Sequence, residues 1–290
     1  MKHRRIWTLG EWLNEWYTVY KLPKLAQTSN RNIEQMIRLH IPDSLKALRL
    51  EDIEAHEVEK ELAKLGNTRT KVYARQVLFS AIAKARALGF VSVNVMEAVE
   101  SVRYKKRRGK ALTLGEQRDF LQAIEGHRYK WLMLFYLYTG VRRTEALTLE
   151  WKDIDVEGRL LVIRGTKTEG SYRTIPLTDD VRAILEAQRK QNSRERRSRG
   201  RYRKADKEIV FPFGREQVSR VFKRLCPAHH LHDLRHTFIT RCAECGVNVT
   251  VCQQLVGHAT ADMTLNVYTH VMDAFKRTEA AKFKLFPDIE

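Results

Sequence analysis

Six side chains between positions 142 and 268 of this 290-residue chain have the types needed to attack a phosphodiester. Arginine binds two phosphate oxygens at once through its planar guanidinium, lysine and histidine transfer protons, and a tyrosine hydroxyl can attack phosphorus. The set needs no metal and indicates phosphoryl transfer with a tyrosine nucleophile. In chain order the six are Arg142, Lys167, His232, Arg235, His258 and Tyr268.

The first two candidates lie in short turn-like motifs. Arg142 follows Gly140 at the end of an apolar stretch, where a tight turn can aim a side chain into a cleft, although the neighbouring Arg143 is a rival. Lys167 lies in Gly-Thr-Lys-Thr-Glu-Gly between two predicted strands, which predicts a hairpin tip. Taken singly, an arginine is more often part of a surface ion pair, and a hairpin lysine is more often solvent-exposed.

The other four candidates lie nearer the C-terminus. His232 and Arg235 are three residues apart, so they share one face of a helix and can approach the same group. His258 follows Gly257, a residue type that often ends helices, and Tyr268 comes ten residues later. Each also has an ordinary structural interpretation: a capping histidine, a surface arginine, a structural histidine and a core tyrosine.

The motifs around these residues resemble those of the tyrosine recombinases, the phage integrase family. That family has, in order, Arg, Lys, His-x-x-Arg, His or Trp, and Tyr, and the chain follows this order from Arg142 to Tyr268. The spelling Thr-Gly-x-Arg-x-x-Glu favours Arg142 over Arg143 and leaves Glu145 as a structural partner. The spelling Leu-x-Gly-His matches at His258.

The resemblance implies a role for each residue. Tyr268 would attack one DNA strand and form a 3′-phosphotyrosyl bond, and Lys167 would protonate the released 5′ oxygen. Strands would then exchange through a Holliday junction without a metal, ATP or any nucleotide cofactor. The other implied roles are phosphate clamps at Arg142 and Arg235, a phosphate hydrogen bond from His258, and transfer of the tyrosine proton by His232.

Composition points to a polyanionic partner. Lys and Arg total 53 against 35 acidic residues, which gives a formal charge of +18 and a pI near 9.9, so nucleic acid is the leading candidate. No apolar run reaches the length of a membrane span, and the basic N-terminus lacks the apolar stretch of a signal peptide. We therefore expect a bacterial cytoplasmic, nucleoid-associated protein.

The four cysteines do not form a disulfide framework. Cys242 and Cys245 have the Cys-x-x-Cys spacing of redox or zinc sites, but no second such pair follows. The alternative interpretation places both on a helix begun at Asp233, as small, partly buried side chains. We expect no metal.

The chain divides at a basic segment. Residues 1–101 read as a helical core-type DNA-binding domain that begins with the capping box Thr8-Leu-Gly-Glu11, and its regular aromatic stripe is typical of a core. Residues 102–111 read as an exposed interdomain linker. This linker is either a solvated charge run or a strap on the DNA backbone, through Arg103, Lys105, Lys106, Arg107 and Arg108.

Residues 112–290 read as a mixed α/β catalytic domain. Helices are predicted over 130–138 and 144–149 and strands over 160–163 and 174–177. Ten basic residues and almost nothing apolar fill positions 189–207, which predicts a flexible loop, either solubilising or DNA-tracking. The pattern over 271–286 is helical, and this tail (271–290) packs either on its own domain or on a neighbouring protomer.

These observations together predict a mainly α protein with a small antiparallel sheet. The resemblance implies a C-shaped clamp that binds double-stranded DNA at paired recombination sites, usually as a homotetramer, with a directionality or host architectural factor as a further partner. The basic stretch over 189–207 favours a phage or mobile-element integrase. The alternatives are an Xer-like dimer resolvase, a type IB topoisomerase and a DNA-binding regulator without catalysis.

Overall fold

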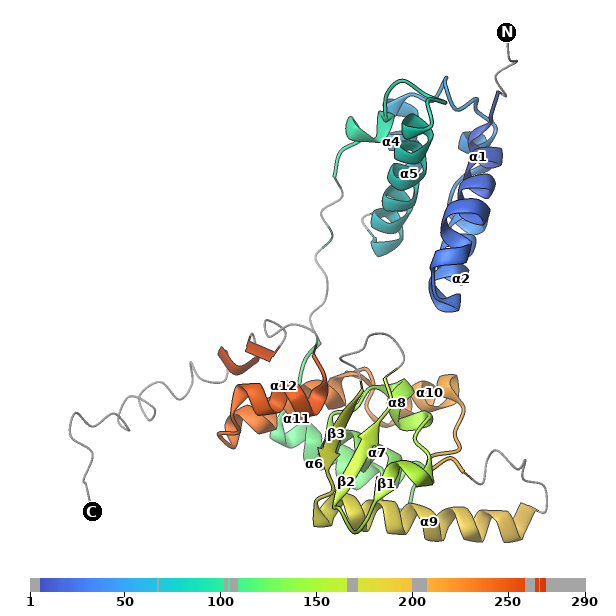
Figure 1. Ribbon diagram of the computed structural model, residues 1–290. Coiled ribbons are helices and arrows are strands. Elements are labelled where there is room, and N and C mark those ends of the chain that lie inside the picture. The colour runs from blue at the N-terminus through green and yellow to red at the C-terminus, as the bar shows by residue number, and fades with distance from the viewer. Residues whose placement is uncertain are drawn as a thin grey trace, which may run out of the picture. The chain divides into compact units, whose positions relative to one another are not determined.

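The computed structural model describes residues 6–66, 68–101, 104, 109–165, 172–199, 208–258, 264, 265 and 267–269. The chain divides into two compact units, Met1–Arg107 and Arg108–Glu290, each with its own hydrophobic core (Figure 1). The basic linker residues 103 and 105–108, the hairpin tip with Lys167 and the tail 271–290 lie outside the described residues. No helix in the described ranges is long and apolar enough to cross a membrane.

Unit 1 is a helical bundle. Its first helix starts at the predicted capping box, in which the Glu11 amide donates to Thr8 Oγ1 at 3.2 Å and the Thr8 amide donates to Glu11 Oε2 at 2.9 Å. Trp12 and Trp16 are buried, and Trp12 Nε1 donates to the carbonyl of Ala81 at 2.8 Å. The core interpretation of these aromatics is confirmed. The helices are α1 (Leu9–Trp16), α2 (Gln27–Leu39), α3 (Asp43–Lys46), α4 (Ala55–Ala63) and α5 (Arg69–Ala87), with short π and 3₁₀ turns η1 (Tyr17–Lys21), η2 (Leu22–Lys24) and η3 (Val95–Glu97).

Unit 2 packs helices around a three-stranded sheet. The strand order is β1-β2-β3, and both pairings are antiparallel, with Leu161 opposite Ile154 and Ile175 opposite Leu161. The predicted mainly α fold with a small antiparallel sheet is confirmed. The strands are β1 (Ile154–Asp155), β2 (Leu160–Ile163) and β3 (Arg173–Pro176). The helices are α6 (Leu114–Ala123), α7 (Lys130–Thr139), α8 (Arg143–Leu147), η4 (Trp151–Asp153), α9 (Asp179–Arg199), α10 (Arg215–Leu225), α11 (Asp233–Glu244) and α12 (Val249–Val256).

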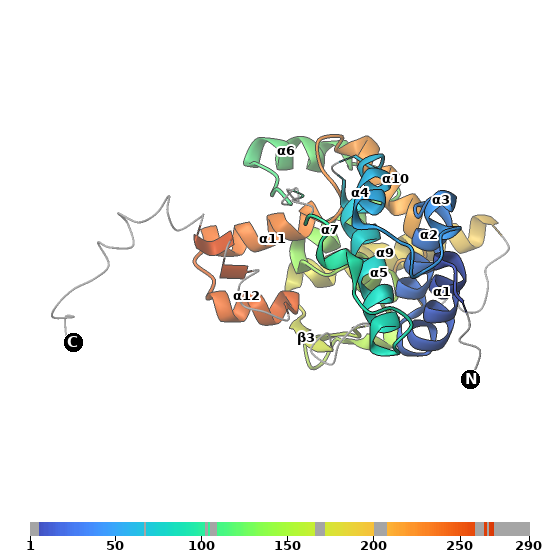
Figure 2. The same cartoon turned by 90° about the horizontal axis from the view of Figure 1, so that it is seen from above.

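Helix α7 is the central element of unit 2 because it is apolar on most of its surface and packs against both α9 and α11. The antiparallel arrangement of α11 and α12 beside it can be followed in two views (Figure 1, Figure 2). Helix α6 begins at a second capping box, Thr113 to Glu116. These elements leave the ends of α7, α8, α11 and α12 near one another, where four of the six candidate side chains lie.

The predicted loop over 189–207 is wrong for its first half. Residues 189–199 continue α9, and the remainder, 200–207, lies outside the described residues. The helix persists because its polar side chains on one face are buried and paired: Gln188 donates to Asn192 Oδ1 at 2.7 Å, and Asn192 donates to the carbonyl of Val210 at 2.9 Å. Glu195 continues this face and forms a two-pronged ion pair with Arg128.

Candidate active site

Arg142 is fixed by the turn between α7 and α8. Gly140 ends α7 in the left-handed conformation (φ 60°), and a β-carbon there would lie 2.4 Å from the ring of Phe238, so only glycine fits. Arg142 then caps α8 in an extended conformation. Its Nη1 donates to Glu145 Oε1 at 2.8 Å and its Nη2 donates to the carbonyl of Gly257 at 2.6 Å, which ties it to the end of α12.

Glu145 holds a second arginine as well as Arg142. Arg173 on β3 donates through Nη1 and Nη2 to the two carboxylate oxygens, at 3.2 and 3.0 Å, and through Nε to the carbonyl of Leu255 at 2.7 Å. Burial alone would raise the pKa of Glu145, but the hydrogen bonds and charge of Arg173 and the bonds from Arg142 outweigh it and lower the pKa. Glu145 is therefore a charged, buried link between α8, β3 and the end of α12, as its predicted structural role required.

Arg235 lies on the first turn of α11 and is 2% exposed. Its Nη1 donates to the carbonyl of Gly140 at 2.7 Å, whereas its Nη2 is buried and has no hydrogen-bond partner among the described residues. Burial and the positive charge of Arg142 lower the pKa of Arg235 to about 9. The guanidinium thus keeps one edge unpaired where a bound anion would be stabilised.

His232 precedes α11 and faces the same region. His232 keeps exposed surface, but desolvation by the surrounding protein, followed by the charges of His236 and Arg235, lowers the pKa of His232 to about 4. The imidazole is therefore neutral at pH 7 and can accept a proton. The ring meets that of His236 edge to face, with centroids 5.1 Å apart. His236 in turn contacts the backbone of Gly109, where an added β-carbon would lie 2.1 Å from Nε2.

His258 follows the left-handed Gly257 that ends α12, as predicted. Its Nδ1 lies 2.8 Å from Thr264 Oγ1. Burial and the charges of Arg235 and Arg142 lower the pKa of His258 to about 3, which keeps this ring neutral as well. The effect of both arginines on its pKa places His258 in the same electrostatic environment as the guanidinium pair.

Tyr268 packs beside α11 and α12 in a small apolar cluster with Ile239, Cys242, Cys252 and Val256. It is 7% exposed, and its buried hydroxyl makes no hydrogen bond of normal geometry with a described residue. Burial and the neighbouring Cys252 thiol raise the pKa of Tyr268. In this arrangement the tyrosine is a protonated, covered phenol.

Two cysteine predictions can be compared with this cluster. Cys242 lies on α11 and is buried, whereas Cys245 caps the end of the helix and is exposed. Within the described ranges, no group of three or more histidine, cysteine or acidic side chains could hold a metal ion. The structural interpretation therefore holds for Cys242 and is wrong for Cys245, which follows the last residue of α11 and is exposed.

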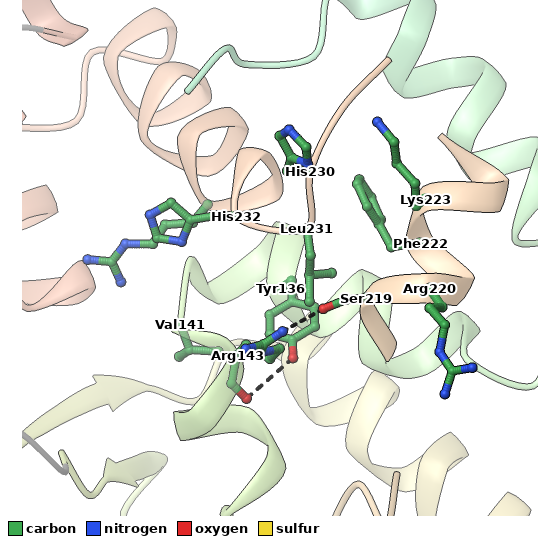
Figure 3. A pocket seen from close by; sticks show the side chains of 11 residues that line it. Tyr136, Val141, Arg143, Ser219, Arg220, Phe222, Lys223, His230, Leu231 and His232 are labelled. Atoms are coloured by element: carbon green, nitrogen blue, oxygen red, sulfur yellow. Dashed lines mark hydrogen bonds between the residues drawn. The ribbon is translucent and has the colours of Figure 1, made fainter. Parts of the chain in front are cut away.

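A basic cleft of about 610 Å³ opens beside His232 and Arg235 (Figure 3). Arg143, the rival of Arg142 in the sequence, lies here instead and donates to Ser219 Oγ on α10 at 2.6 Å. Lys223 also lines the cleft. Positive side chains therefore line the cleft beside Arg235.

Sequence reasoning gave no role to two residues that organise this region. Arg173 holds Glu145, and His229 is a loop residue whose buried ring lies 3.2 Å from Glu116 and 3.3 Å from Asp233, joining α6 to the start of α11. The predicted strand 174–177 began one residue too late to include Arg173. Extended by one residue, it would have placed Arg173 on the inward face with Ile175, where a charge needs a buried partner. The pairing of His229 with Glu116 spans more than a hundred residues and left no local signal.

Known proteins resemble both units. The sequence model of the phage integrase family matches residues 110–274, and that of the phage integrase N-terminal SAM-like domain matches residues 8–66. Tyrosine recombinase XerA of Saccharolobus solfataricus is 30% identical over 79% of this chain and 72% of its own length. An integrase of Streptomyces ambofaciens is 26% identical over 90% of this chain and 76% of its own length. A tyrosine recombinase XerC-like protein of Caldanaerobacter subterraneus is 28% identical, but the chain spans only about half (49%) of its length.

Solved structures with the same fold are integrases. The Tn1549 transposon integrase in complex with a circular intermediate DNA superposes with a TM-score of 0.78 at 19% identity, covering 95% of this chain and 99% of the other. A lambda integrase dimer bound to a core site gives a TM-score of 0.76 at 22% identity, covering 91% and 78%. At these identities the superpositions establish the fold, and the sequence matches establish the family. The chain belongs to the phage integrase family of tyrosine recombinases.

Proposed function

We propose that this chain is a site-specific integrase of a phage or mobile element, in which Tyr268 cleaves DNA through a 3′-phosphotyrosyl intermediate. The observation that carries the proposal is the Nη2 of Arg235, which is buried near Arg142 and has no hydrogen-bond partner in the described part of the chain. A buried polar group without a partner costs about 1–3 kcal/mol, and more when charged. A scissile phosphate bound between the two guanidinium groups would supply the missing acceptors.

The electrostatics support separate roles for the two histidines. His232 is neutral and reaches the cleft, so it can accept the proton of the attacking hydroxyl. His258 is neutral and lies beside the arginine pair, so it can donate one hydrogen bond to a phosphate oxygen. We assign proton transfer to His232 and phosphate binding to His258.

The hydroxyl of Tyr268 must become uncovered before it can attack phosphorus. Its hydroxyl is covered by the apolar cluster of α11 and α12, and its raised pKa disfavours the phenolate. A base next to the phosphate is consequently needed at the moment of attack. Lys167, on the β2–β3 connection, is proposed as the acid that protonates the leaving 5′ oxygen, by its position in the family motif.

The partners follow from the same proposal. We propose double-stranded DNA with paired sites as the substrate, contacted also by the linker residues Arg103, Lys105, Lys106, Arg107 and Arg108. A lambda integrase tetramer bound to a Holliday junction shares the fold, with a TM-score of 0.73, and supports a homotetramer on DNA. A directionality or host architectural factor would act on that assembly.

The second candidate is an Xer-like dimer resolvase, which is favoured by relatives named XerA at 28–32% identity. Covalent protein-DNA adducts distinguish the two. The chain is incubated with element and host DNA, denatured with SDS, and the attached ends are sequenced beside a Tyr268→Phe control that still binds DNA. Adducts at the ends of an element support an integrase, and adducts at one chromosomal site support a resolvase.

The same assay can refute the chemistry. Adducts formed by Tyr268→Phe would reject this nucleophile. Adducts scattered over many sequences would favour a type IB topoisomerase. A protein that binds DNA tightly but forms no adduct under any condition would instead be a DNA-binding regulator.

A further inference from the structure

Helix α9 presents a basic face that no part of the proposed active site uses. Lys190, Arg194 and Arg197 are exposed on its second half, and none of them pairs with a carboxylate among the described residues. Two other cations of the helix are occupied: Arg182 binds Glu186 at 2.9 Å, and Arg189 stacks on the Trp151 ring at 5.1 Å. The unpaired cations are therefore confined to one segment of about 12 Å, at a rise of about 1.5 Å per residue.

The helix holds this face in a fixed position. With roughly 100° between successive residues, the three cations lie on the side of α9 opposite its buried residues. The same part of α9 is attached to Arg128 through two side chains. Gln191 donates to the carbonyl of Arg128 at 2.9 Å, and Glu195 pairs with the Arg128 guanidinium. The buried residues of α9 are Val181, Ile184, Leu185, Gln188 and Asn192.

Helix stability does not account for this pattern. Lys190 and Arg194 are four residues apart and Arg194 and Arg197 are three apart, which are spacings at which like charges repel. Interaction with the helix dipole favours cations only in the last turn, and Lys190 lies more than two turns before Arg199. Of the three cations only Arg197 lies in that last turn, so the dipole does not account for the whole row.

We propose that this face of α9 is a second DNA-binding surface, which contacts the phosphates of a duplex segment other than the one held at the active site. Helix α9 carries none of the candidate catalytic residues, and its C-terminal end projects beyond the neighbouring elements of unit 2 (Figure 1). A rigid row of arginine and lysine suits a regular row of phosphates, since the guanidinium and ammonium groups need no base-specific geometry. The inference rests on the proposed function, because it takes DNA as the substrate.

The test compares a variant that removes the three charges with one that keeps them. Lys190→Gln, Arg194→Gln and Arg197→Gln are combined in the first, and Lys190→Arg, Arg194→Lys and Arg197→Lys in the second. Binding is measured over a range of salt concentrations on the shortest duplex that the wild type binds and on the same duplex extended on both sides. A third sample adds the extension as a separate duplex, which distinguishes flanking DNA from a second DNA molecule.

On the extended duplex, the slope of log affinity against log salt should fall by about 2.7 for the charge-removing variant, about 0.9 for each lost phosphate contact. The short duplex should show no change, and the charge-keeping variant should match the wild type on both. An equal fall in slope on the short and the extended duplex would mean that this face contacts the same DNA segment as the active site. An unchanged slope on both duplexes would mean that the face does not contact DNA. Both results overturn the proposal. Adduct formation on the short duplex is scored separately, so its absence in the wild type refutes the proposed chemistry and leaves the salt slopes interpretable.

Discussion

Replacing Arg173 should test whether the buried carboxylate of Glu145 sets the geometry of the active site. The side chains of Arg173 and Glu145 are 7% and 2% exposed, so their ion pair is shielded from water. Removing one partner of a buried pair costs about 3–5 kcal/mol, because it leaves the other charge uncompensated. Arg142 still bonds Glu145, so we expect the lower end, about 3 kcal/mol, for Arg173→Met.

Arg173→Lys should separate stability from catalysis. The lysine keeps the charge, but a single ammonium cannot bond both Glu145 oxygens and the Leu255 carbonyl, so we expect a loss of about 1.5–3 kcal/mol, the worth of one charged hydrogen bond. The bonds through which Arg173 links Glu145, the partner of Arg142, to the end of α12 are then weakened. A shift of about 1 Å in a reacting group can cost about a hundredfold in rate, and we expect that loss in adduct formation with DNA affinity unchanged.

The stability difference should depend on pH in a defined direction. The folded pKa of Glu145 lies below its ordinary value of 4.5, so its stabilising contribution is present above pH 4.5 and disappears as the pH falls through the folded pKa. Urea denaturation followed by circular dichroism should show the wild type and Arg173→Met converging in acid. A constant difference across this range would mean that the ion pair is not the source of the stability.

Arg128→Lys is the matched control for catalysis. This change weakens another two-pronged ion pair, the one between Arg128 and Glu195 of α9, which lies away from the candidate site. We expect it to destabilise unit 2 and to leave adduct formation intact in the folded protein. The reasoning is refuted if Arg173→Lys cleaves at the wild-type rate, or if Arg128→Lys loses the same factor.

Three shorter predictions concern the same region. Arg235→Gln should slow adduct formation by about a hundredfold or more, because it removes a donor to the transition state. The free energy of unfolding should be kept or raised, because the variant also removes an incompletely paired buried charge. A fall in both the free energy of unfolding and the rate, measured on one sample, would contradict this. Gly140→Ala should lose more than about 1 kcal/mol in urea denaturation because of its positive φ and the Phe238 ring, whereas Gly115→Ala on α6 meets open space and should not. The second-order rate of adduct formation should stay level down to about pH 5 and fall as His232 protonates near pH 4. A midpoint near 6.5 would contradict the lowered pKa of His232.

Local signals predicted most helix boundaries in this chain. The capping box at Thr8 involves residues three apart and forms as predicted, and a box of the same spacing at Thr113 begins α6. Gly257, predicted to end a helix, likewise has a positive φ angle of 65°, because only a residue without a side chain ends a helix there without strain. Such features depend on a few neighbouring residues, so sequence alone is sufficient to find them.

The second half of α9 could not be found in this way. Its composition is that of a loop, and the helix is held by Asn192 bonding Val210 and by Glu195 bonding Arg128, contacts between segments distant in sequence. Polar side chains that pair when buried look identical, in sequence, to polar side chains in water. Of the candidate site, residue types and order were predictable, whereas the shared carboxylate that links Arg142 to Arg173 required the structure.

The charge balance of the site favours the transition state over the substrate. Arg142, Arg173 and Arg235 bring three positive charges to one carboxylate, Glu145, and the pKa values of His232 and His258 leave both rings neutral at pH 7. These groups thus carry a net charge of about +2 before DNA binds. Under the proposed chemistry a phosphodiester brings one negative charge, and the pentavalent phosphorus formed by attack brings a second. Because the second charge develops only during the reaction, the excess positive charge lowers the barrier more than it tightens binding, which is the condition for catalysis.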